Sequence, residues 1–399
     1  MLLWIIVLAI FAGLYMAWSI GSNDVANSMA TAVGAKAITL KQALIIASIL
    51  NFTGAILVGT HVTDTIKNRI VDVSSMSQHS ILLGFLAALL SAAFFVTLST
   101  WKELPVSTTH AVVGGIAGFG LIQGGMNAIQ WKEIGMVVSS WVISPIVGGI
   151  ISFIIFKLIA KSIFSSKEPI KSAKNLSPFF VGLTIFIITL SIFMKTRAGE
   201  FLNEDIKKIL LVSLFAAVIS SIIGYFLIKK VKEKGRDYGI IEKIFRKLQV
   251  MTSCYVAFSH GANDVANAAA PVAVVLSLAW HHVDTIYILA LGGFGIALGI
   301  LTWGHKVIST VGSKITSLTN TRGFSIDFAV ATVVLTASKL GLPISTSHTV
   351  VGAVIGVGLA RGLEAVDLSI VKKIIYAWLF TLPASMIVSI LIYMGLSII

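Results

Sequence analysis

A ten-residue polar motif occurs twice in this chain, and each copy lies inside long apolar sequence. Residues 21–30 are GSNDVANSMA and residues 261–270 are GANDVANAAA, with seven identical positions at an offset of 240. A second motif repeats in step, because residues 104–114 are LPVSTTHAVVG and residues 342–352 are LPISTSHTVVG. Polar groups are costly in hydrocarbon, so polar motifs within membrane helices indicate function. Duplicated motifs of this kind are typical of secondary transporters built from two repeats.

The composition indicates a membrane protein. Hydrophobic residues make up 56% of the chain and charged residues 12%, whereas soluble domains average about 25% charged residues. Several stretches reach the roughly 20 apolar residues that span a bilayer core. The first of them, residues 2–20, has no basic region before it and no cleavage pattern after it, so we interpret it as a mature helix. A single cysteine, Cys254, excludes a disulfide within the chain and a thiol-based metal or redox centre.

The net charge of +13 comes from Lys and Arg in loops, so we interpret it as topogenic charge and expect no nucleic-acid partner. The two most basic loops, 161–177 and 229–249, are separated by two predicted spans and therefore lie on one side, the cytoplasm by the positive-inside rule. Propagation through twelve spans puts both termini outside. It also places 21 of the 30 Lys and Arg residues inside, eight outside and one within a span. We expect a multi-pass cell-membrane protein with loop 229–249 in the cytoplasm.

The predicted fold class is an all-α polytopic membrane protein of about twelve transmembrane helices. The first polar motif then enters the membrane from outside and the second from inside, which makes the two repeats inverted. Segments 80–125 and 324–360 are ambiguous, because each either crosses the membrane as a helix pair or re-enters it as a hairpin. Broken helices or hairpins are therefore expected at the centre. The helices are predicted near residues 2–20, 42–60, 80–101, 105–125, 134–160, 178–195, 207–228, 250–280, 285–305, 324–341, 344–360 and 374–398.

Three units are predicted along the chain. Residues 1–160 form the first inverted repeat and residues 250–399 the second, while residues 161–249 link them with two helices and a basic cytoplasmic loop. The linker has no counterpart in either half, so it joins halves that face opposite ways. We interpret its basic loop as a surface helix on anionic lipid, with a site for a regulatory partner as the alternative.

The NDVAN copies present carboxylate and amide oxygens, which suit a hard monovalent cation such as Na⁺ and offer no soft ligand for copper or zinc. Gly21 and Gly261 precede the copies, and an unwound turn there would free carbonyl oxygens for the same ion. One alternative is that the Asn side chains only bond across packed helices; another is that the two Asp residues carry protons. The predicted cation ligands are Asn23, Asp24, Asn27, Asn263, Asp264 and Asn267.

The LPxST copies predict an anion site. Pro105 and Pro343 break or begin a helix. Hydroxyls and free amides at a helix start bind anions, aided by the positive end of the helix dipole. Two such starts at a pseudo-two-fold axis would give a nest of up to six hydroxyls for a tetrahedral oxyanion; plain capping of the helix ends is the alternative. The six hydroxyl residues are Ser107, Thr108, Thr109, Ser345, Thr346 and Ser347.

His110 and His348 close the two LPxST motifs. Each is either a buried neutral side chain bonded to a carbonyl or an accessory group that contacts the anion or couples protons. No Arg lies near either motif in the sequence, so helix ends and bound cations must compensate the charge of a bound anion. An anion held with a cation is less costly within the membrane than the anion alone, which predicts cation coupling.

The paired GSNDVANSMATAVG and GANDVANAAAPVAVV, together with LPVSTTH and LPISTSH, resemble the inorganic phosphate transporter (PiT) family, whose duplicated signature is specific. The resemblance covers residues 1–160 and 250–399. It implies twelve spans, inverted repeats and cation-coupled phosphate uptake. It also implies that phosphate is held by the six hydroxyl residues of the LPxST motifs, and that the cation is held by Asn23, Asp24, Asn263 and Asp264.

We therefore predict a secondary active transporter that takes up inorganic phosphate with a cation by alternating access, with Na⁺ favoured over H⁺ as the coupling ion. Sulfate symport and metal-phosphate symport driven by H⁺ are the alternatives. A passive anion channel would show flux without a cation gradient. An intramembrane hydrolase is disfavoured because a nucleophile is needed once and every polar element here is duplicated, so no enzyme is expected. The expected partners are inorganic phosphate, Na⁺ or H⁺ and the lipid bilayer, with a homodimer left open.

Overall fold

The structure, a computed structural model, describes residues 2–104, 106–194, 196–231, 237–280, 283–308, 318–362 and 368–398. Helices account for nearly all of these residues, with one isolated β-bridge between Val71 and Ile129. Each of the twelve predicted helices is present, the one predicted at 250–280 as α10 and α11, and Pro105 lies outside the described residues. The helices are α1 (Leu2–Gly34), α2 (Leu40–Val58), α3 (Thr60–Arg69), α4 (Gln78–Trp101), α5 (Thr108–Ala128), α6 (Trp131–Ile159), η1 (Ala160–Phe164), α7 (Pro169–Phe193), α8 (Arg197–Glu200), α9 (Ile206–Lys229), α10 (Asp237–Asp264), α11 (Ala266–Ala279), α12 (Thr285–Trp303), α14 (Asn320–Lys339), α15 (Thr346–Arg361) and α16 (Leu368–Leu396).

Ten segments of the described chain are long and apolar enough to cross a membrane, and α10 with α11 counts as one of them. The helices α14 and α15, which surround the second LPxST motif, are not among the ten. The sequence of α15 is only 16 residues long, or about 24 Å at the usual helical rise, which is short of a bilayer core. A multi-pass helical membrane protein is thus confirmed.

Local polar residues begin several of these helices. Thr39 and Gln42 form a capping box at the start of α2. The Asp284 carboxylate accepts a hydrogen bond from the backbone N–H of Ile286 at the start of α12. These caps satisfy amides that a helix leaves without a partner in its first turn. The starts of these helices are therefore encoded by polar residues next to them in the sequence.

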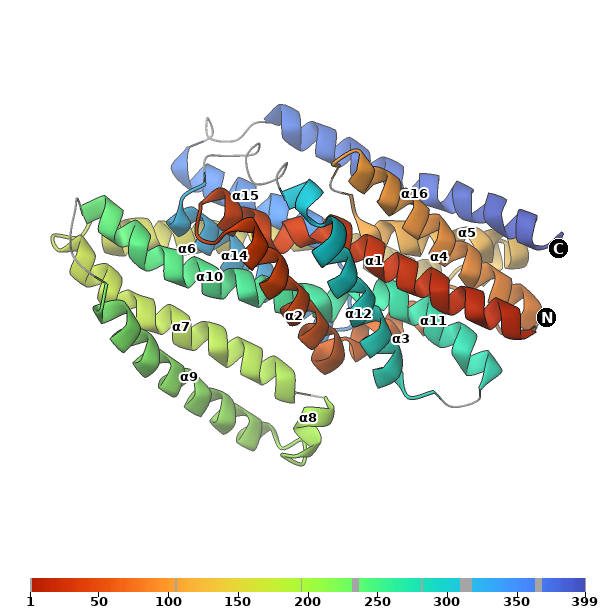
Figure 1. Cartoon of the computed structure of the whole chain (residues 1–399), viewed down its shortest axis with the longest axis horizontal. Helices are drawn as coiled ribbons and strands as arrows, with labels where there is room; N and C mark the ends of the chain where they lie inside the picture. Colours follow the sequence, from red (N-terminus) through yellow and green to blue (C-terminus); the bar gives the residue numbers. More distant parts are fainter. Residues whose placement is uncertain are drawn as a thin grey trace.

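The two LPxST motifs lie at the tips of two helical hairpins. Figure 1 shows α4 and α5 side by side toward one end of the molecule and α14 and α15 toward the other. The tips meet, because the Thr109 hydroxyl donates to the Ile344 carbonyl (3.0 Å) and the Ser347 hydroxyl donates to the Val106 carbonyl (3.3 Å). The ambiguous segments are hairpins that enter the bundle from opposite ends. Whether they re-enter the membrane stays a prediction.

The two halves of the chain are interlocked. Helix α1 of the first half packs along α12 of the second half. Its counterpart in the second half, α10, packs along α2 of the first half. Likewise α5 packs against α16, while α15 packs against α6. Each contact thus has a counterpart with the halves exchanged. This matching favours a duplicated chain, and the boundaries at residues 160 and 250 stay predictions.

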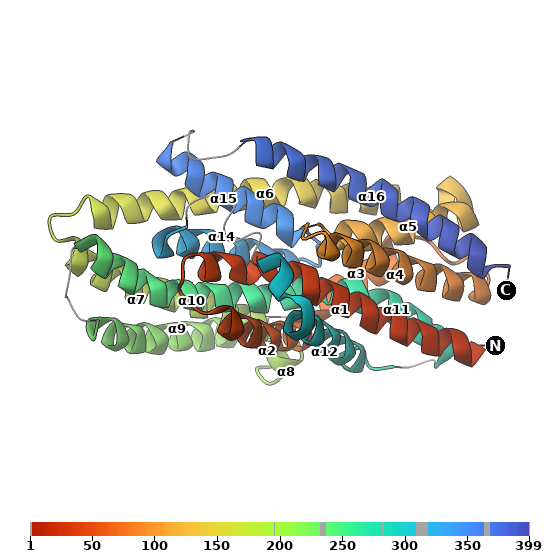
Figure 2. The ribbon, with the colours of Figure 1, turned by 45° about the horizontal axis from the view of Figure 1, so that its top comes forward.

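The linker helices α7 and α9 lie side by side along one flank of the bundle, and α7 also packs against α10 (Figure 1). Both chain termini lie at one end of the molecule in Figures 1 and 2, while the start of α7, the end of α9 and the start of α10 lie at the other. An even number of crossings would place the termini together in this way. Which side faces the cytoplasm stays a prediction.

The prediction of an unwound turn at the NDVAN motif is wrong. In the first copy α1 is helical throughout, and it continues to Gly34 instead of ending near residue 20. In the second copy α10 gives way to α11 at Val265, whose backbone still has right-handed helical angles. The polar residues of both copies therefore act through their side chains, because their backbone groups stay within the helices.

Gly21 and Gly261 serve close packing instead. A Cβ atom at Gly21 would collide with the carbonyl oxygen of Ile296 on α12, and one at Gly261 would collide with the carbonyl oxygen of Asn51 on α2. Both helix crossings depend on the missing side chain. The glycines thus bring each NDVAN motif against a helix of the opposite half.

Candidate binding site between the hairpin tips

The carboxylates of the two NDVAN motifs lie against the hairpin tips. Asp24 and Asp264 are 1% and 0% exposed. The Thr108 hydroxyl donates to Asp24 Oδ2 at 2.8 Å, and the Thr346 hydroxyl donates to Asp264 Oδ2 at 3.2 Å. Each carboxylate thus contacts a hydroxyl of the hairpin in its own half. The predicted cation and anion sites are neighbouring parts of one buried site.

Asn27 and Asn267 reach across to the hairpin of the opposite half. The Asn27 amide donates to the hydroxyls of Thr346 (3.2 Å) and Ser347 (2.9 Å). The Asn267 amide donates to the hydroxyls of Thr108 (3.5 Å) and Thr109 (3.2 Å). Both were predicted as cation ligands, and the structure places their N–H groups against the hydroxyls of the anion nest. They join the two hairpins.

Asn23 and Asn263 fasten each hairpin to the motif helix of its own half. The Asn23 amide donates to the Thr100 hydroxyl (2.9 Å) and the Leu104 carbonyl (3.1 Å). The Asn263 amide donates to the Ser338 hydroxyl and the Leu342 carbonyl, both at 3.1 Å. These bonds hold the chain where each hairpin stops being helical. A positioning role for both amide nitrogens follows from these bonds.

The six hydroxyl residues divide into two kinds. Ser107 and Ser345 are N-caps, since each hydroxyl accepts a bond from the backbone N–H three residues later, at 3.3 Å in both copies. The hydroxyls of the other four lie between the tips of the hairpins, where α5 and α15 begin. All six residues are buried. The nest therefore has four inward hydroxyls, namely those of Thr108, Thr109, Thr346 and Ser347.

Three buried acceptor oxygens of the second copy have no hydrogen-bond donor among the described residues. They are the side-chain Oδ1 atoms of Asn263, Asp264 and Asn267. In the first copy Asn23 Oδ1 accepts a bond from the Val106 N–H at 3.3 Å. Buried acceptors are almost always satisfied by a donor, a water or an ion. Three such oxygens within five residues fit the needs of a hard cation.

The sequence reasoning missed His260 and Asn51, which lie behind Asp264. His260 Nε2 is 2.7 Å from Asp264 Oδ2, and His260 Nδ1 is 2.7 Å from Asn51 Oδ1. The Asn51 amide nitrogen donates to the Ala47 carbonyl, so its oxygen faces the ring and His260 Nδ1 is the donor. The distance between Nε2 and Oδ2 is short enough for a hydrogen bond when one of the two groups carries a proton.

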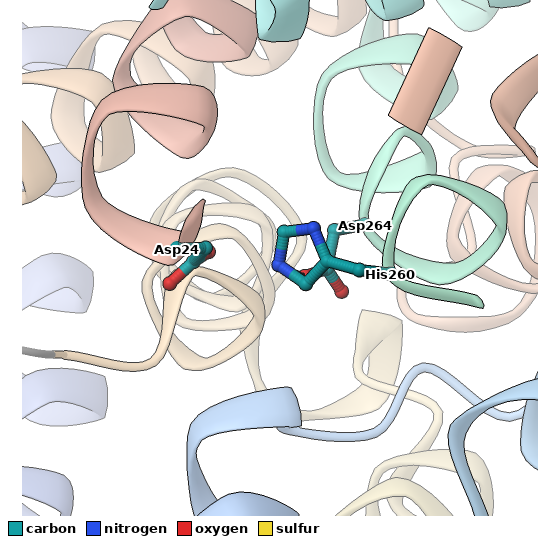
Figure 3. A group of neighbouring side chains, drawn as sticks. All are labelled: Asp24, His260 and Asp264. Carbon is teal, nitrogen blue, oxygen red and sulfur yellow. Dashed lines mark ion pairs between the residues drawn. The ribbon is translucent and has the colours of Figure 1, made fainter. Parts of the chain in front are cut away.

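Figure 3 shows the His260 ring against the side chain of Asp264, with Asp24 facing the pair from α1. One ligand atom from each of the three residues lies within 4.8 Å of the other two. The signal that could have revealed His260 is its position one helical turn before Asp264, on the same helix face. The corresponding position of the first copy is Ile20, so a search for duplicated polar residues passes over it.

Asp327 is a second missed carboxylate. It lies on α14, is 1% exposed, and accepts bonds from the hydroxyls of Thr31 (2.7 Å) and Ser253 (2.6 Å). These partners belong to α1 and α10, so Asp327 connects the second hairpin to both motif helices. It is not duplicated, because the corresponding residue of α4 is Leu89.

His110 and His348 pack against each other behind the hydroxyls. Their ring centroids are 4.6 Å apart in an edge-to-face arrangement, and His110 stacks on Trp141 at 3.7 Å. His348 Nδ1 lies 3.2 Å from the Trp141 carbonyl oxygen. This contact agrees with one of the two predictions for His348, that of a buried side chain bonded to a carbonyl. The side chain of Trp378, the counterpart of Trp141, lies outside the described residues.

Among the residues whose side-chain burial the structure describes, a group that excludes residues 368–375, every Lys and Arg side chain is at least partly exposed. The positive charge available to an anion from the described groups at the site is therefore that of two helix starts, with that of His260 added when its ring is protonated. Two carboxylates already lie there. Additional cations are needed before an anion can be held at this depth.

Comparison with known proteins identifies the family. Residues 20–389 match the phosphate transporter family. A protein of Pyrococcus furiosus named as a phosphate permease is 48% identical, and the alignment covers 98% of this chain and 96% of that protein. The chloroplastic inorganic phosphate transporter 2-1 of Arabidopsis thaliana is 42% identical over 93% of this chain and 68% of its own length. A solved structure titled as the sodium-dependent phosphate transporter is 46% identical, with a TM-score of 0.94 and 99% of each chain covered. This chain therefore belongs to the phosphate transporter family, as a transporter and not an enzyme.

Proposed function

We propose that this protein takes up inorganic phosphate together with Na⁺ by alternating access. One observation carries the proposal: two hairpin tips present hydroxyls and helix starts to each other, directly beside two buried carboxylates. An anion-binding element and a cation-binding element in contact provide coupling, because each bound ion lowers the electrostatic cost of the other.

Phosphate binds between the tips in this proposal. The hydroxyls of Thr108, Thr109, Thr346 and Ser347 surround the anion, and the first turns of α5 and α15 direct backbone N–H groups and the positive ends of their dipoles at it. Asn27 and Asn267 already donate to these hydroxyls. Their amide groups can therefore turn to donate to phosphate oxygens at the same place.

Sodium binds beside the carboxylates. Asp24 and Asp264 supply negative charge, and the free oxygens of Asn263, Asp264 and Asn267 supply neutral and charged ligands of the kind Na⁺ prefers. The solved structure that this chain resembles is titled sodium-dependent. Because a bound phosphate adds negative charge to a site that holds two carboxylates, cation and phosphate should bind with positive cooperativity.

The hairpins suggest how access alternates. Each one closes the route to the site from its own end, since they enter from opposite ends and meet in the middle (Figure 1). Movement of one half against the other would open one route while the second stays closed. We propose that both hairpins re-enter the membrane, that the halves are inverted repeats, and that the termini face outside with loop 229–249 in the cytoplasm.

The decisive experiment is uptake of labelled phosphate into proteoliposomes. An inward Na⁺ gradient is compared with an inward H⁺ gradient at zero Na⁺, each at the same membrane potential. We expect uptake with Na⁺ alone. Uptake with H⁺ alone would keep the phosphate site and reject sodium coupling. Uptake without either gradient would indicate a passive channel, and no phosphate uptake under any condition would reject the proposed substrate.

Proton coupling is the second candidate, and the His260–Asp264 pair favours it, because two titratable groups 2.7 Å apart within the site are placed to bind and release a proton. Sulfate and metal-phosphate are the alternative substrates. An excess of unlabelled sulfate tests the first, since competition equal to that of unlabelled phosphate would indicate a general oxyanion site. Uptake that requires a divalent cation in addition to the gradient would indicate a metal-phosphate substrate.

A further inference from the structure

A long apolar groove lies between α6 and the second hairpin, which run side by side (Figure 2). Its volume is about 750 Å³, within the range of pockets that hold small ligands. One wall is a stripe of α6 that runs from Lys132 to Ile151, about 28 Å at the usual helical rise. The other wall is formed by the last turns of α14 and by Leu342 and Ile344 at the hairpin tip.

The open side of the groove faces the membrane. Helix α6 belongs to a segment that is long and apolar enough to cross a bilayer. On its groove side Met136, Ile143 and Val147 are 43%, 56% and 37% exposed, and across the groove Leu340 is 69% exposed. In a bilayer the medium around these side chains is hydrocarbon. Acyl chains therefore fill the groove, because an unfilled void forfeits the contacts of its walls.

The walls of the groove offer little to a polar ligand. Ser139, Ser140 and Thr332 line it, and each donates its hydroxyl to a backbone carbonyl of the same helix, at 2.7, 2.6 and 2.7 Å. Hydroxyls bonded in this way need no further partner in hydrocarbon. Along most of its length the groove thus fits a chain of methylene groups.

A single positive charge lies at one end of the groove. Lys132 is the one charged residue among the described residues that line it. Its ammonium group forms no ion pair or hydrogen bond within the described chain. The next residue, Glu133, does not line the groove, because successive residues of a helix face different directions. Lys132 belongs to the first turn of α6, and lysines near the ends of membrane helices extend to the level of the lipid head groups.

A cation at the end of an apolar groove is complementary to an amphiphile with an anionic head group. We propose that the groove binds one acyl chain of an anionic phospholipid, with the lipid phosphate at Lys132 and the chain along α6. Hydrophobic transfer does not drive this binding, since hydrocarbon surrounds the chain in the bilayer as well. Packing against the walls holds the chain, and the charge of Lys132 selects the head group.

A chain in this position reaches the tip of the second hairpin. The Trp141 ring nitrogen donates to the Pro343 carbonyl at 3.0 Å, so the tip lies beside the middle of α6. A chain of one leaflet spans about half of the roughly 30 Å hydrocarbon core, and from Lys132 it therefore extends to this depth. Ile344 lines the groove, and its carbonyl accepts the hydroxyl of Thr109 from the first hairpin. The lipid thus packs against an element that forms the candidate site, while its own site is separate and can be measured without transport.

The test is photo-cross-linking of the purified full-length protein in detergent. The probe is phosphatidylglycerol that carries a diazirine midway along one acyl chain, and mass spectrometry of the digested protein locates the cross-links. Unlabelled phosphatidylglycerol and phosphatidylcholine with identical acyl chains then compete for the labelled position. Native mass spectrometry of the same samples reports whether the protein is a monomer or a dimer.

Two variants and two matched controls separate the head group from the chain. Lys132→Gln removes the charge, and its control is Lys207→Gln, an exposed lysine at the start of α9. Ser139→Phe fills the groove, and its control is Val142→Phe, a position of α6 that is 57% exposed and does not line the groove. Equal thermal unfolding midpoints verify that all four variants fold.

We expect cross-links in α6 and in the tip of the second hairpin. Phosphatidylglycerol should displace the probe about fivefold more effectively than phosphatidylcholine, since one lysine near an anionic lipid contributes about that factor. Lys132→Gln should abolish this preference and leave the cross-links in place. Ser139→Phe should remove the cross-links. Both controls should behave as the wild type does.

Three results would overturn the proposal. The first is cross-links that all lie outside the groove or that persist in Ser139→Phe. The second is equal competition by the two lipids, or a preference that Lys132→Gln leaves unchanged. The third is a dimer that Ser139→Phe separates and that cannot be cross-linked in the groove, which would assign the groove to a second copy of this chain.

Discussion

The two copies of the candidate site share a hydroxyl bond in front of their carboxylates and differ in their other contacts. In front, Asp24 accepts from Thr108 as Asp264 accepts from Thr346. Behind, His260 is bonded to Asp264, whereas the first copy has the apolar Ile20 at this position. The shared bonds place the hydroxyls of the two hairpin tips in matching positions, although Asp24 Oδ1 also accepts a bond from Asn27 at 3.3 Å and Asp264 Oδ1 has no donor among the described residues. The unshared histidine makes the two carboxylates unequal, so we expect one cation position to differ from the other.

The largest expected effect comes from removing either carboxylate. We expect Asp24→Asn and Asp264→Asn each to reduce the initial rate of phosphate uptake by about a hundredfold or more, because a lost charged ligand is worth about 3 kcal/mol. The two variants should differ in their residual Na⁺ dependence, since only Asp264 is also bonded to His260. The measurement is uptake by proteoliposomes across a series of Na⁺ concentrations.

A matched control for these variants is Asp72→Asn. Asp72 is an exposed carboxylate that accepts a bond from the Ser74 N–H at 2.9 Å, outside the helices. It should transport like the wild type. If both site variants kept the sodium dependence of the wild type, Asp24 and Asp264 would not be cation ligands.

The next largest effect should come from adding a methyl group at Gly21 or Gly261, the glycine at the start of each NDVAN motif. We expect Gly21→Ala and Gly261→Ala to lower the free energy of unfolding by similar amounts, about 3 kcal/mol, because both meet a backbone carbonyl that cannot move aside. Gly135→Ala on α6 is the control, since open space surrounds it, and should be neutral or stabilising. Thermal unfolding in detergent is the measurement. A large difference between the first two would show that the helix crossings are not equivalent.

A smaller effect should follow when the second copy is made to resemble the first. His260→Ile introduces the residue found at position 20 and leaves Asn51 Oδ1 buried without a donor, at a cost of about 1–3 kcal/mol. Adding Asn51→Ile, which copies Ile296, should recover part of this stability, because replacing both partners is less costly than replacing one. Unfolding midpoints of the single and double variants test this. Additive losses would show that the two residues do not act as a pair.

The same variants test whether the cation sites at Asp24 and Asp264 are equivalent. With His260 absent, the surroundings of Asp264 approach those of Asp24. The Na⁺ concentration for half-maximal uptake should therefore change in His260→Ile, and the dependence on H⁺ should weaken. An unchanged response to both ions would place His260 outside the coupling machinery.

Ten of the predicted helices were predictable because the length of a span is set by the bilayer, and ten segments of the described chain meet that requirement. The helix α1 is the exception. It was predicted to end near residue 20, since Asn and Asp usually mark the end of a helix, yet it continues to Gly34 because its polar residues face the hairpins. The pairing of the two motifs was predictable from their common offset. Their contact across halves, Asn27 with Thr346 and Ser347, depends on interlocking that no local pattern encodes.

His260, Asn51 and Asp327 escaped prediction for a different reason. Each is a single polar residue whose counterpart is apolar, so a search based on duplication discards it. The contact of His260 with Asp264 is local, one helical turn apart, but the bonds of Asn51 to His260 and of Asp327 to Thr31 and Ser253 are tertiary contacts. Duplication in the sequence therefore identifies the common nest, whereas the features that distinguish the copies require the structure.

The smallest effects should come from single hydroxyls, where the two copies are most alike. Thr109→Val and Ser347→Ala each remove one inward hydroxyl, and both donate to a carbonyl of the opposite hairpin tip. We expect each to raise KM for phosphate about fivefold, since one hydrogen bond is worth about 1 kcal/mol. Ser107→Ala removes only a helix cap, so it should lower stability by about 1 kcal/mol with KM nearly unchanged. Labelled uptake at graded phosphate concentrations tests all three. Complete loss of transport from one inward hydroxyl would mean that the nest depends on a single residue and that the copies are unequal here too.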